Sequence, residues 1–111
     1  MEIIRKSGEL TKKDIYNLSR SPEIEKMRDH VDEIIAVGKY LIYTDVNGNG
    51  DSVTVLCVED KETGRVIASN SMTARQEFEY IADLMEGEDF TIKVCSGTSK
   101  NGRSYITVAM I

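Results

Sequence analysis

The sequence lacks any apolar run long enough to cross a bilayer, and its first residues contain no signal-peptide hydrophobic region. We therefore expect a cytoplasmic protein. Cysteine is scarce, since only Cys57 and Cys95 are present and neither belongs to a C-x-x-C pair. Both lie in apolar, strand-like runs, so we expect buried thiols in a reducing compartment rather than a disulfide or a metal site.

Groups that carry catalysis are also scarce. His30 is the only histidine, and the chain has no nucleophile elbow, no glycine-rich phosphate loop and no paired histidine or cysteine ligands. His30 stands at the expected end of a helix beside Asp29, where a role as a surface cap accounts for it. The sequence therefore predicts a protein that is not an enzyme and that holds no cofactor.

One motif is similar to half of a calcium loop. Asp45, Asn47, Asn49 and Asp51 alternate with other residues as in the first half of an EF-hand. The twelfth position falls on Leu56, where an EF-hand needs a bidentate glutamate, and the flanking residues predict strands rather than helices. Asn-Gly and Asp residues also suit a turn with left-handed backbone, so we predict a turn and no metal.

A chain of 111 residues has room for one domain with one core. Runs rich in β-branched and aromatic residues predict the strands Ile34–Thr44, Val53–Val58, Arg65–Ser69, Phe90–Ser96 and Ser104–Ile111. Apolar spacing of three and four residues predicts a helix between the third and fourth of these strands. This order is that of a five-stranded OB-type Greek-key barrel, a mainly β fold, although other small barrels and α+β meanders share it.

Three local signals refine this barrel, which we place at residues 31–111. Gly38, inside the first strand, predicts the bend that lets one strand serve two sheets. The helix is expected from Thr73, which forms a capping box with Gln76, to about Glu86, with Gly87 as the left-handed cap. Its buried stripe is predicted at Phe78, Ile81, Ala82 and Met85.

Residues 1–30 predict a short helical extension packed on the barrel. Thr11 caps a first helical turn with Ile15 and Leu18 on its apolar face. The pair Ser21-Pro22 has the N-cap and first-position residues that start a second helix.

Charge is unevenly distributed along the chain. The net charge is −5, which argues against a polyanion as partner. Residues 31–89 hold four basic and thirteen acidic side chains, whereas residues 90–111 hold three basic side chains and no acidic one. The end of the chain is therefore a local positive region, although a cluster of only three like charges can also arise by chance.

The last two strands indicate where that positive region lies. Alternation places Phe90, Ile92, Val94, Ile106, Val108 and Met110 in the core. The opposite face then carries Lys93 and Tyr105, beside a loop that holds Lys100, Asn101 and Arg103. Cations for phosphates next to an aromatic ring for a base are typical of sites for single-stranded nucleic acid.

The first strand adds two residues to this candidate site. Lys39 and Tyr43 share one side of that strand and Tyr40 lies on the other, so one tyrosine is expected to be exposed near the following loop. OB domains bind oligonucleotides over a sheet face and through two loops, which here are residues 45–51 and 97–103.

Two stretches of the chain resemble small bacteriophage single-stranded DNA-binding proteins. The segment from Ser96 to Thr107, with Gly97-Thr98-Ser99-Lys100-Asn101-Gly102-Arg103 at its start, is similar to the end of those proteins. Residues 10–16 and 21–27 are similar to their N-terminal extension. The resemblance implies an OB barrel that coats single-stranded DNA during replication in the host cytoplasm, without sequence preference or cofactor. A second copy of the chain and replication proteins are open as further partners.

A second hypothesis comes from the acidic part of the chain. Glu77, Glu79, Asp83 and Glu86 share the outer face of the expected helix, and Glu88 and Asp89 follow it. These residues would form the functional surface of an acidic phage or bacterial protein-interaction module that binds no nucleic acid. A solvated helix face explains the same charges.

Overall fold

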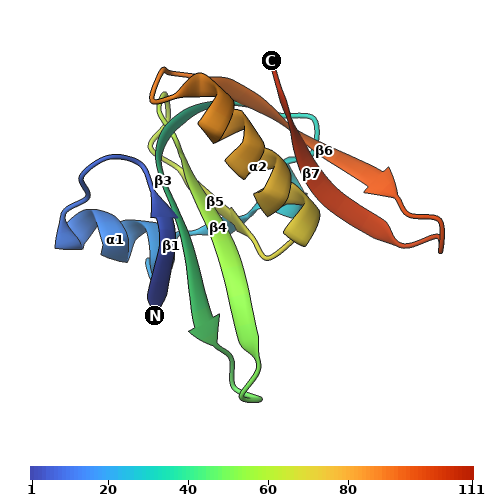
Figure 1. The fold of residues 1–111 in the computed structure, drawn as a ribbon, viewed down its shortest axis with the longest axis horizontal. Helices are drawn as coiled ribbons and strands as arrows, with labels where there is room; N and C mark the ends of the chain where they lie inside the picture. Colours follow the sequence, from blue (N-terminus) through green and yellow to red (C-terminus); the bar gives the residue numbers. More distant parts are fainter.

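The computed structural model describes residues 1–111, and most of them belong to one strongly curled, open β-sheet (Figure 1). The strands are β1 (Glu2–Lys6), β2 (Glu25–Lys26), β3 (Ile34–Val46), β4 (Ser52–Asp60), β5 (Val66–Ser69), β6 (Thr91–Thr98) and β7 (Ser104–Met110). The helices are α1 (Lys12–Ser19), the 3-10 helix η1 (Met27–His30) and α2 (Met72–Met85). None of these helices is long and apolar enough to cross a membrane.

The strands follow the order β2-β5-β4-β3-β6-β7, and β1 pairs with β3. The long strand β3 bends, so that Ile34–Ala36 pairs with β6 and Val37–Val46 pairs with β4. The register shifts between Val37 and Tyr40, around Gly38, as the sequence predicted. A Cβ atom at Gly38 would lie 2.8 Å from Glu59 Oε1 and 3.3 Å from the Glu59 carbonyl oxygen, so the bend leaves no room for a larger residue.

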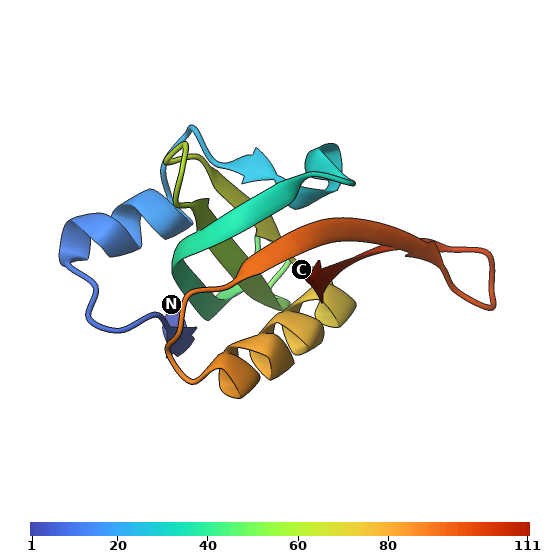
Figure 2. The ribbon, with the colours of Figure 1, turned by 90° about the horizontal axis from the view of Figure 1, so that it is seen from above.

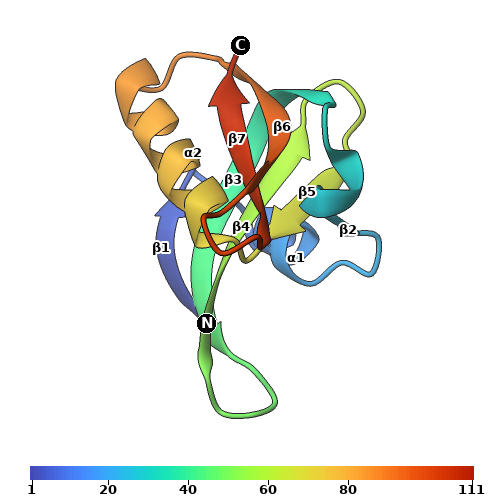
Figure 3. The ribbon, with the colours of Figure 1, turned by 90° about the vertical axis from the view of Figure 1, so that its right-hand side faces the viewer.

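The mainly β class is confirmed, but the prediction of five strands is wrong, because the sheet has seven. The sheet is also open. β7 pairs only with β6, and the edge of β5 that faces away from β4 is taken by β2, which runs parallel to it. No backbone pairing therefore joins β5 to β7, and α2 lies on the other side of the molecule from β2 and η1 (Figure 3).

The N-terminal thirty residues are only partly helical. α1 forms as predicted, with Thr11 and Asp14 in a reciprocal capping box and Leu18 buried. The second helix predicted from Ser21 is absent, because Ser21 caps a single turn, after which the chain extends into β2. Pairing of β2 with β5 and full burial of Met27 in the core outweigh the local capping signal.

The main core lies between the sheet and α2, and Phe78, Ile81 and Ala82 are buried in it as predicted. The N-cap of α2 is Ser71 rather than Thr73. Its hydroxyl accepts from the Ala74 amide at 3.2 Å and donates to the Ile106 carbonyl oxygen at 2.6 Å, so it caps α2 and ties it to β7.

The end of α2 and the last two strands follow the predicted pattern with one exception. Glu86 and Gly87 both adopt left-handed backbone at the end of α2, which matches the predicted cap. The inward positions Ile92, Val94 and Val108 are buried. Met110 was also predicted to be core but is 46% exposed, because β7 ends there at the rim of the sheet.

Candidate functional site

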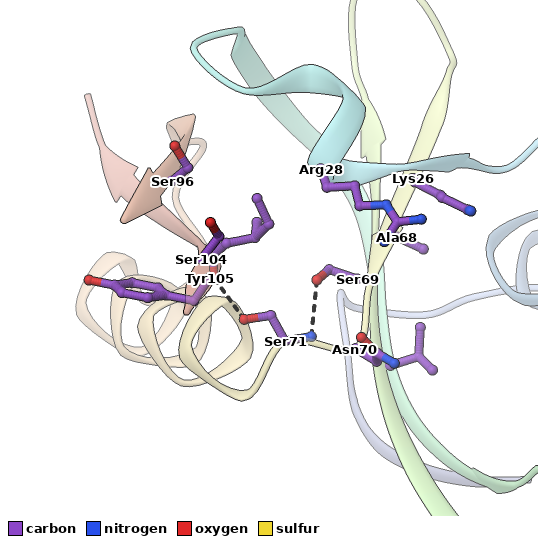
Figure 4. A pocket seen from close by; sticks show the side chains of 11 residues that line it. Lys26, Arg28, Ala68, Ser69, Asn70, Ser71, Ser96, Ser104 and Tyr105 are labelled. Carbon is purple, nitrogen blue, oxygen red and sulfur yellow. Dashed lines mark hydrogen bonds between the residues drawn. The ribbon is translucent and has the colours of Figure 1, made fainter. Parts of the chain in front are cut away.

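A cleft of about 710 Å³ lies where the sheet is open, between β5 and η1 on one side and the β6–β7 hairpin on the other (Figure 4). Its lining residues are Lys26, Arg28, Val55, Ala68, Ser69, Asn70, Ser71, Ser96, Ser104, Tyr105 and Ile106. None of them is acidic, although the chain has 19 acidic and 14 basic residues. The cleft is therefore a cationic and hydroxyl-rich surface on an acidic protein.

Both cations of the cleft come from the β2–η1 segment. Lys26 is the last residue of β2 and Arg28 lies in η1, on either side of the fully buried Met27. Neither side chain forms an ion pair within the chain. Met27 anchors the segment in the core, and the two positive charges remain free for a ligand.

The opposite wall and the floor of the cleft are rich in hydroxyl groups. Ser96 and Ser104 belong to β6 and β7, on the same face of the hairpin as the half-buried Ile106. Ser69 Oγ accepts from the Ser71 amide at 3.0 Å, at the start of α2. Hydroxyl donors beside lysine and arginine are the groups that proteins use for phosphate oxygens. The cleft thus has the chemistry of an anion site.

The basic hairpin loop, residues Ser99–Arg103, extends from the body of the molecule (Figure 2). It joins β6 and β7, whose residues Ser96 and Ser104 line the cleft. The Ser99 amide donates to the Arg103 carbonyl oxygen at 2.8 Å, and the Arg103 amide donates to Ser99 Oγ at 3.2 Å, which closes the turn. Lys100, Asn101 and Arg103 are exposed, and neither cation forms an ion pair. The loop brings these three predicted site residues together.

Tyr105 lies on the outer face of β7, directed away from Arg28 and Ser69 (Figure 4). It is 37% exposed, which confirms the prediction that it points away from the core. Its ring covers Gly97, its partner on β6, since a Cβ atom built on Gly97 would lie 2.5 Å from the ring. Because Gly97 has no side chain, the Tyr105 ring can pack over it, beside the basic hairpin loop.

Lys93 shares the outer face of β6 with Cys95 and Gly97. Its ammonium group lies 4.0 Å from Asp32 Oδ1, and its side chain is 41% exposed. The charge of Lys93 is therefore partly neutralised by its own chain, in contrast to the charges of Lys100 and Arg103.

Lys39 and Tyr43 lie elsewhere, where α1 packs on β3. Lys39 Nζ is 2.9 Å from Asp14 Oδ1, and this contact lowers the pKa of Asp14 to about 2 and raises the pKa of Lys39. Tyr43 packs against the small core of Leu18, Leu41 and Cys57, and burial raises its pKa. Neither Tyr43 nor Tyr40 is fully exposed, so the structure does not bring these first-strand residues to the cleft.

Lys26 and Arg28 were not predicted as site residues, because the segment that contains them was predicted to be helical. Had it been treated as extended, alternation around the apolar Met27 would have placed both neighbours on the surface. His30 was also misplaced. It is buried rather than a surface cap, with Nδ1 2.8 Å from Glu33 Oε2 and Nε2 2.9 Å from Glu25 Oε1.

The two thiols differ from each other. Cys57 is buried as predicted, and burial raises its pKa to about 12. Cys95 is only half-buried, on the outer face of β6. Both are free cysteines.

No protein-family model matches this chain, and comparisons with curated proteins and with solved structures likewise gave no match.

Proposed function

We propose that the protein binds single-stranded DNA without sequence preference, as an OB-type domain left open between β5 and β7. Support for the fold comes from the strand order β5-β4-β3-β6-β7, which is the 3-2-1-4-5 order of an OB barrel. α2 stands between the third and fourth of these strands, where such barrels carry their helix. β1 and β2 are then additions at the edges.

The observation that carries the proposal is the pair of unpaired cations in a cleft without acidic residues, next to a hairpin that ends in two more. Lys26 and Arg28 on one wall of the cleft, with Lys100 and Arg103 in the basic hairpin loop, all lack intrachain ion pairs. The lining of the cleft holds hydroxyl groups and no acidic side chain. A polyanion finds there the favourable contacts that the net charge of −5 opposes elsewhere.

In the proposed complex, the four cations contact phosphates, while the Tyr105 ring stacks on a base at the outer face of the hairpin. Phosphate contacts position a strand and carry no sequence information, and an aromatic ring stacks on any base. This combination predicts binding to single strands with little base preference.

The test is a fluorescence anisotropy titration of the full chain with labelled oligo-dT and with a duplex of equal length. We expect tighter binding to oligo-dT. The logarithm of affinity should fall with the logarithm of salt concentration at a slope of roughly −0.7 per phosphate contact. The double variant Lys26→Gln/Arg28→Gln should weaken binding and flatten this slope by about 1.4.

A matched control removes the same charge at a distant place. Lys12 and Lys13 are exposed on α1, at the end of the molecule opposite the basic hairpin loop (Figures 1 and 2). Lys12→Gln/Lys13→Gln should therefore leave the slope within experimental error of the parent chain. Equal losses in the two double variants would mean that only net charge matters, and no oligo-dT binding at low salt would refute the proposal.

One observation favours the second hypothesis, a protein-interaction module. Tyr80 and Leu84 lie one turn apart on α2 and are 63% and 56% exposed. The exposed carboxylate of Glu77 lies on the same helix, and that of Glu86 lies at its C-cap. An apolar pair on an acidic helix suits a protein partner with a basic surface, and the expected result is then a stoichiometric complex that Leu84→Lys abolishes.

A further inference from the structure

Gly97 lies in β6, where its own backbone does not require a glycine. It is not among the glycines with positive φ, so an alanine could adopt the same backbone conformation. Glycine also weakens the interior of a strand, where β-branched and aromatic residues are favoured. A glycine inside a strand often marks the close approach of another group, and Gly97 has such a neighbour.

The group that approaches Gly97 is the far end of the Tyr105 side chain. A Cβ atom at position 97 would lie 2.5 Å from both Cζ and the hydroxyl oxygen of Tyr105, and 3.0 Å from its Cε1. The two residues are direct partners in the pairing of β6 with β7. The Tyr105 ring therefore leans across the hairpin onto β6 and occupies the space that any side chain at position 97 would take.

Tyr105 is the only aromatic residue on the outer face of this hairpin. Alternation places the following residues on that face: Lys93, Cys95 and Gly97 of β6, and Tyr105, Thr107 and Ala109 of β7. Tyr105 comes two residues after Arg103, at the end of the basic hairpin loop. The ring, which is 37% exposed, is thus the one surface of the hairpin on which a base could stack.

Cations alone do not favour a single strand over a duplex. Duplex DNA carries one phosphate charge per about 1.7 Å of its axis, and each phosphate contact releases more counterion there than on a single strand. Lysine and arginine therefore find phosphates on both. A base in a duplex is stacked between its neighbours, whereas an unpaired base can turn a face to an aromatic ring. A preference for single strands must therefore come from the ring.

We propose, on the basis of the proposed function, that Gly97 determines the preference for single strands, as a positioning residue that holds the Tyr105 ring against the hairpin. An unrestrained surface tyrosine samples several rotamers, and ordering it on binding lowers affinity. In this fold the ring is ordered before a base arrives, because its far end already packs on Gly97. A side chain at position 97 would remove that packing.

The test is Gly97→Ala, which adds one methyl group where the ring now lies. The variant should fold, since its backbone suits alanine and the displaced atoms are the end of a flexible side chain. NMR should show the loss of NOEs between the Tyr105 ring protons and the Hα of residue 97. In anisotropy titrations, oligo-dT affinity should fall roughly threefold to tenfold, while duplex affinity changes less than about twofold and the salt slope is unchanged.

Three further variants show whether Gly97 acts through the ring. Tyr105→Ala should lower the ratio of oligo-dT affinity to duplex affinity at least as much as Gly97→Ala does. The double variant should lower it no further than Tyr105→Ala, because both changes affect the same ring. Ala109→Ser is the matched control. It adds one heavy atom at an exposed position of the same face, about 13 Å along β7 from Tyr105, and should leave the ratio unchanged.

The outcomes distinguish Gly97 from the proposed function as a whole. If the parent chain does not bind oligo-dT at low salt, the proposed function is refuted and the role of Gly97 falls with it. If the parent chain prefers oligo-dT and Gly97→Ala keeps the same preference, only the role of Gly97 is overturned. Equal losses of oligo-dT and duplex affinity in Gly97→Ala, or an additional loss in the double variant, would also overturn it, because Gly97 would then act on the hairpin rather than through the ring.

Discussion

Two of the hairpin loops, the β3–β4 loop (residues 47–51) and the basic hairpin loop, have similar shapes but opposite chemistry. The β3–β4 loop and the basic hairpin loop both project from the sheet and close by a turn (Figure 1). In the β3–β4 loop the polar groups are used by the chain itself. Asp45, near the end of β3, lies 3.2 Å from Arg20 and 3.9 Å from the Met1 ammonium group. In the loop itself, Asn47 Oδ1 accepts from the Asn49 and Asp51 amides.

The basic hairpin loop uses its backbone and the Ser99 hydroxyl to close the turn, and leaves Lys100 and Arg103 without a partner. The OB resemblance assigns both loops to nucleic acid, but their contacts indicate different roles. The β3–β4 hairpin uses Asp45 to contact Met1 and Arg20 and uses Asn47 to close its own turn, whereas the basic hairpin loop has cations without an intrachain partner. Whether a charged side chain already has an intrachain partner therefore indicates its role better than the sign of its charge does.

The largest expected difference concerns the two tyrosines that the sequence assigned to one site. Tyr43→Ala removes a side chain from the small core under α1 and should lower the free energy of unfolding by about 2–4 kcal/mol. Tyr105→Ala removes a ring that covers Gly97 at the surface and should cost about 1 kcal/mol or less. Urea denaturation followed by circular dichroism measures both values.

The order should reverse for binding. Tyr105→Ala removes a stacking surface worth about 1–3 kcal/mol per base and should leave the salt slope unchanged. Tyr43→Ala should keep the parent affinity once results are corrected for the folded fraction. If Tyr105→Ala destabilises the fold but leaves oligo-dT binding per folded molecule unchanged, Tyr105 is not part of the binding site.

The next effect concerns the charges of the basic hairpin loop. Lys100→Gln/Arg103→Gln should lower oligo-dT affinity and flatten the salt slope by about 1.4, because two phosphate contacts are lost. Its stability should stay within about 0.5 kcal/mol of the parent chain, since both side chains are exposed and unpaired. The measurement is oligo-dT affinity as a function of salt concentration, for this double variant and for Lys12→Gln/Lys13→Gln. Equal salt slopes in the two double variants would count against a role of the basic hairpin loop in binding.

Elements with strong internal patterns could be predicted from the sequence. The bend at Gly38 and the apolar stripe of α2 are properties of short segments, and both are confirmed. β1 and β2 could not be predicted in this way. Each is a short strand that exists because it pairs with a distant one, β1 with β3 and β2 with β5, and its own residues carry no strand pattern.

The residues of the candidate site divide in the same way, into those that a local pattern predicts and those that depend on distant pairing. Tyr105 and the basic hairpin loop follow from alternation within one hairpin, and the structure places them together. Lys26 and Arg28 reach the cleft only through the pairing of β2 with β5 and the burial of Met27. Lys39 and Tyr43 do not reach the cleft, because α1 covers that side of β3 and contacts both side chains.

A smaller effect is expected at Asp45, near the end of β3, which leads into the β3–β4 loop. Asp45→Asn weakens the contacts with Arg20 and the Met1 ammonium group, which are partly exposed ion pairs worth about 0.2–1 kcal/mol. Oligo-dT affinity and salt slope should not change, because this loop is not expected to contact phosphates. A marked gain in affinity for Asp45→Asn would show that the acidic loop lies near the bound strand and would break the contrast between the two loops.

The smallest effect concerns the ion pair between α1 and β3. Contact with Lys39 and the Thr11 amide lowers the pKa of Asp14 to about 2, so the ionised form stabilises the folded state. A lowered pKa gives stabilisation that is complete above the usual aspartate value and disappears as pH falls from about 4 to about 2. Lys39→Gln should therefore have a lower urea midpoint than the parent chain at pH 6, and the two midpoints should converge near pH 2. Lys13→Gln, which removes an unpaired charge from the same helix, should show no such convergence. A difference for Lys39→Gln that persists at pH 2 would mean that Lys39 acts through its aliphatic packing on α1 rather than through Asp14.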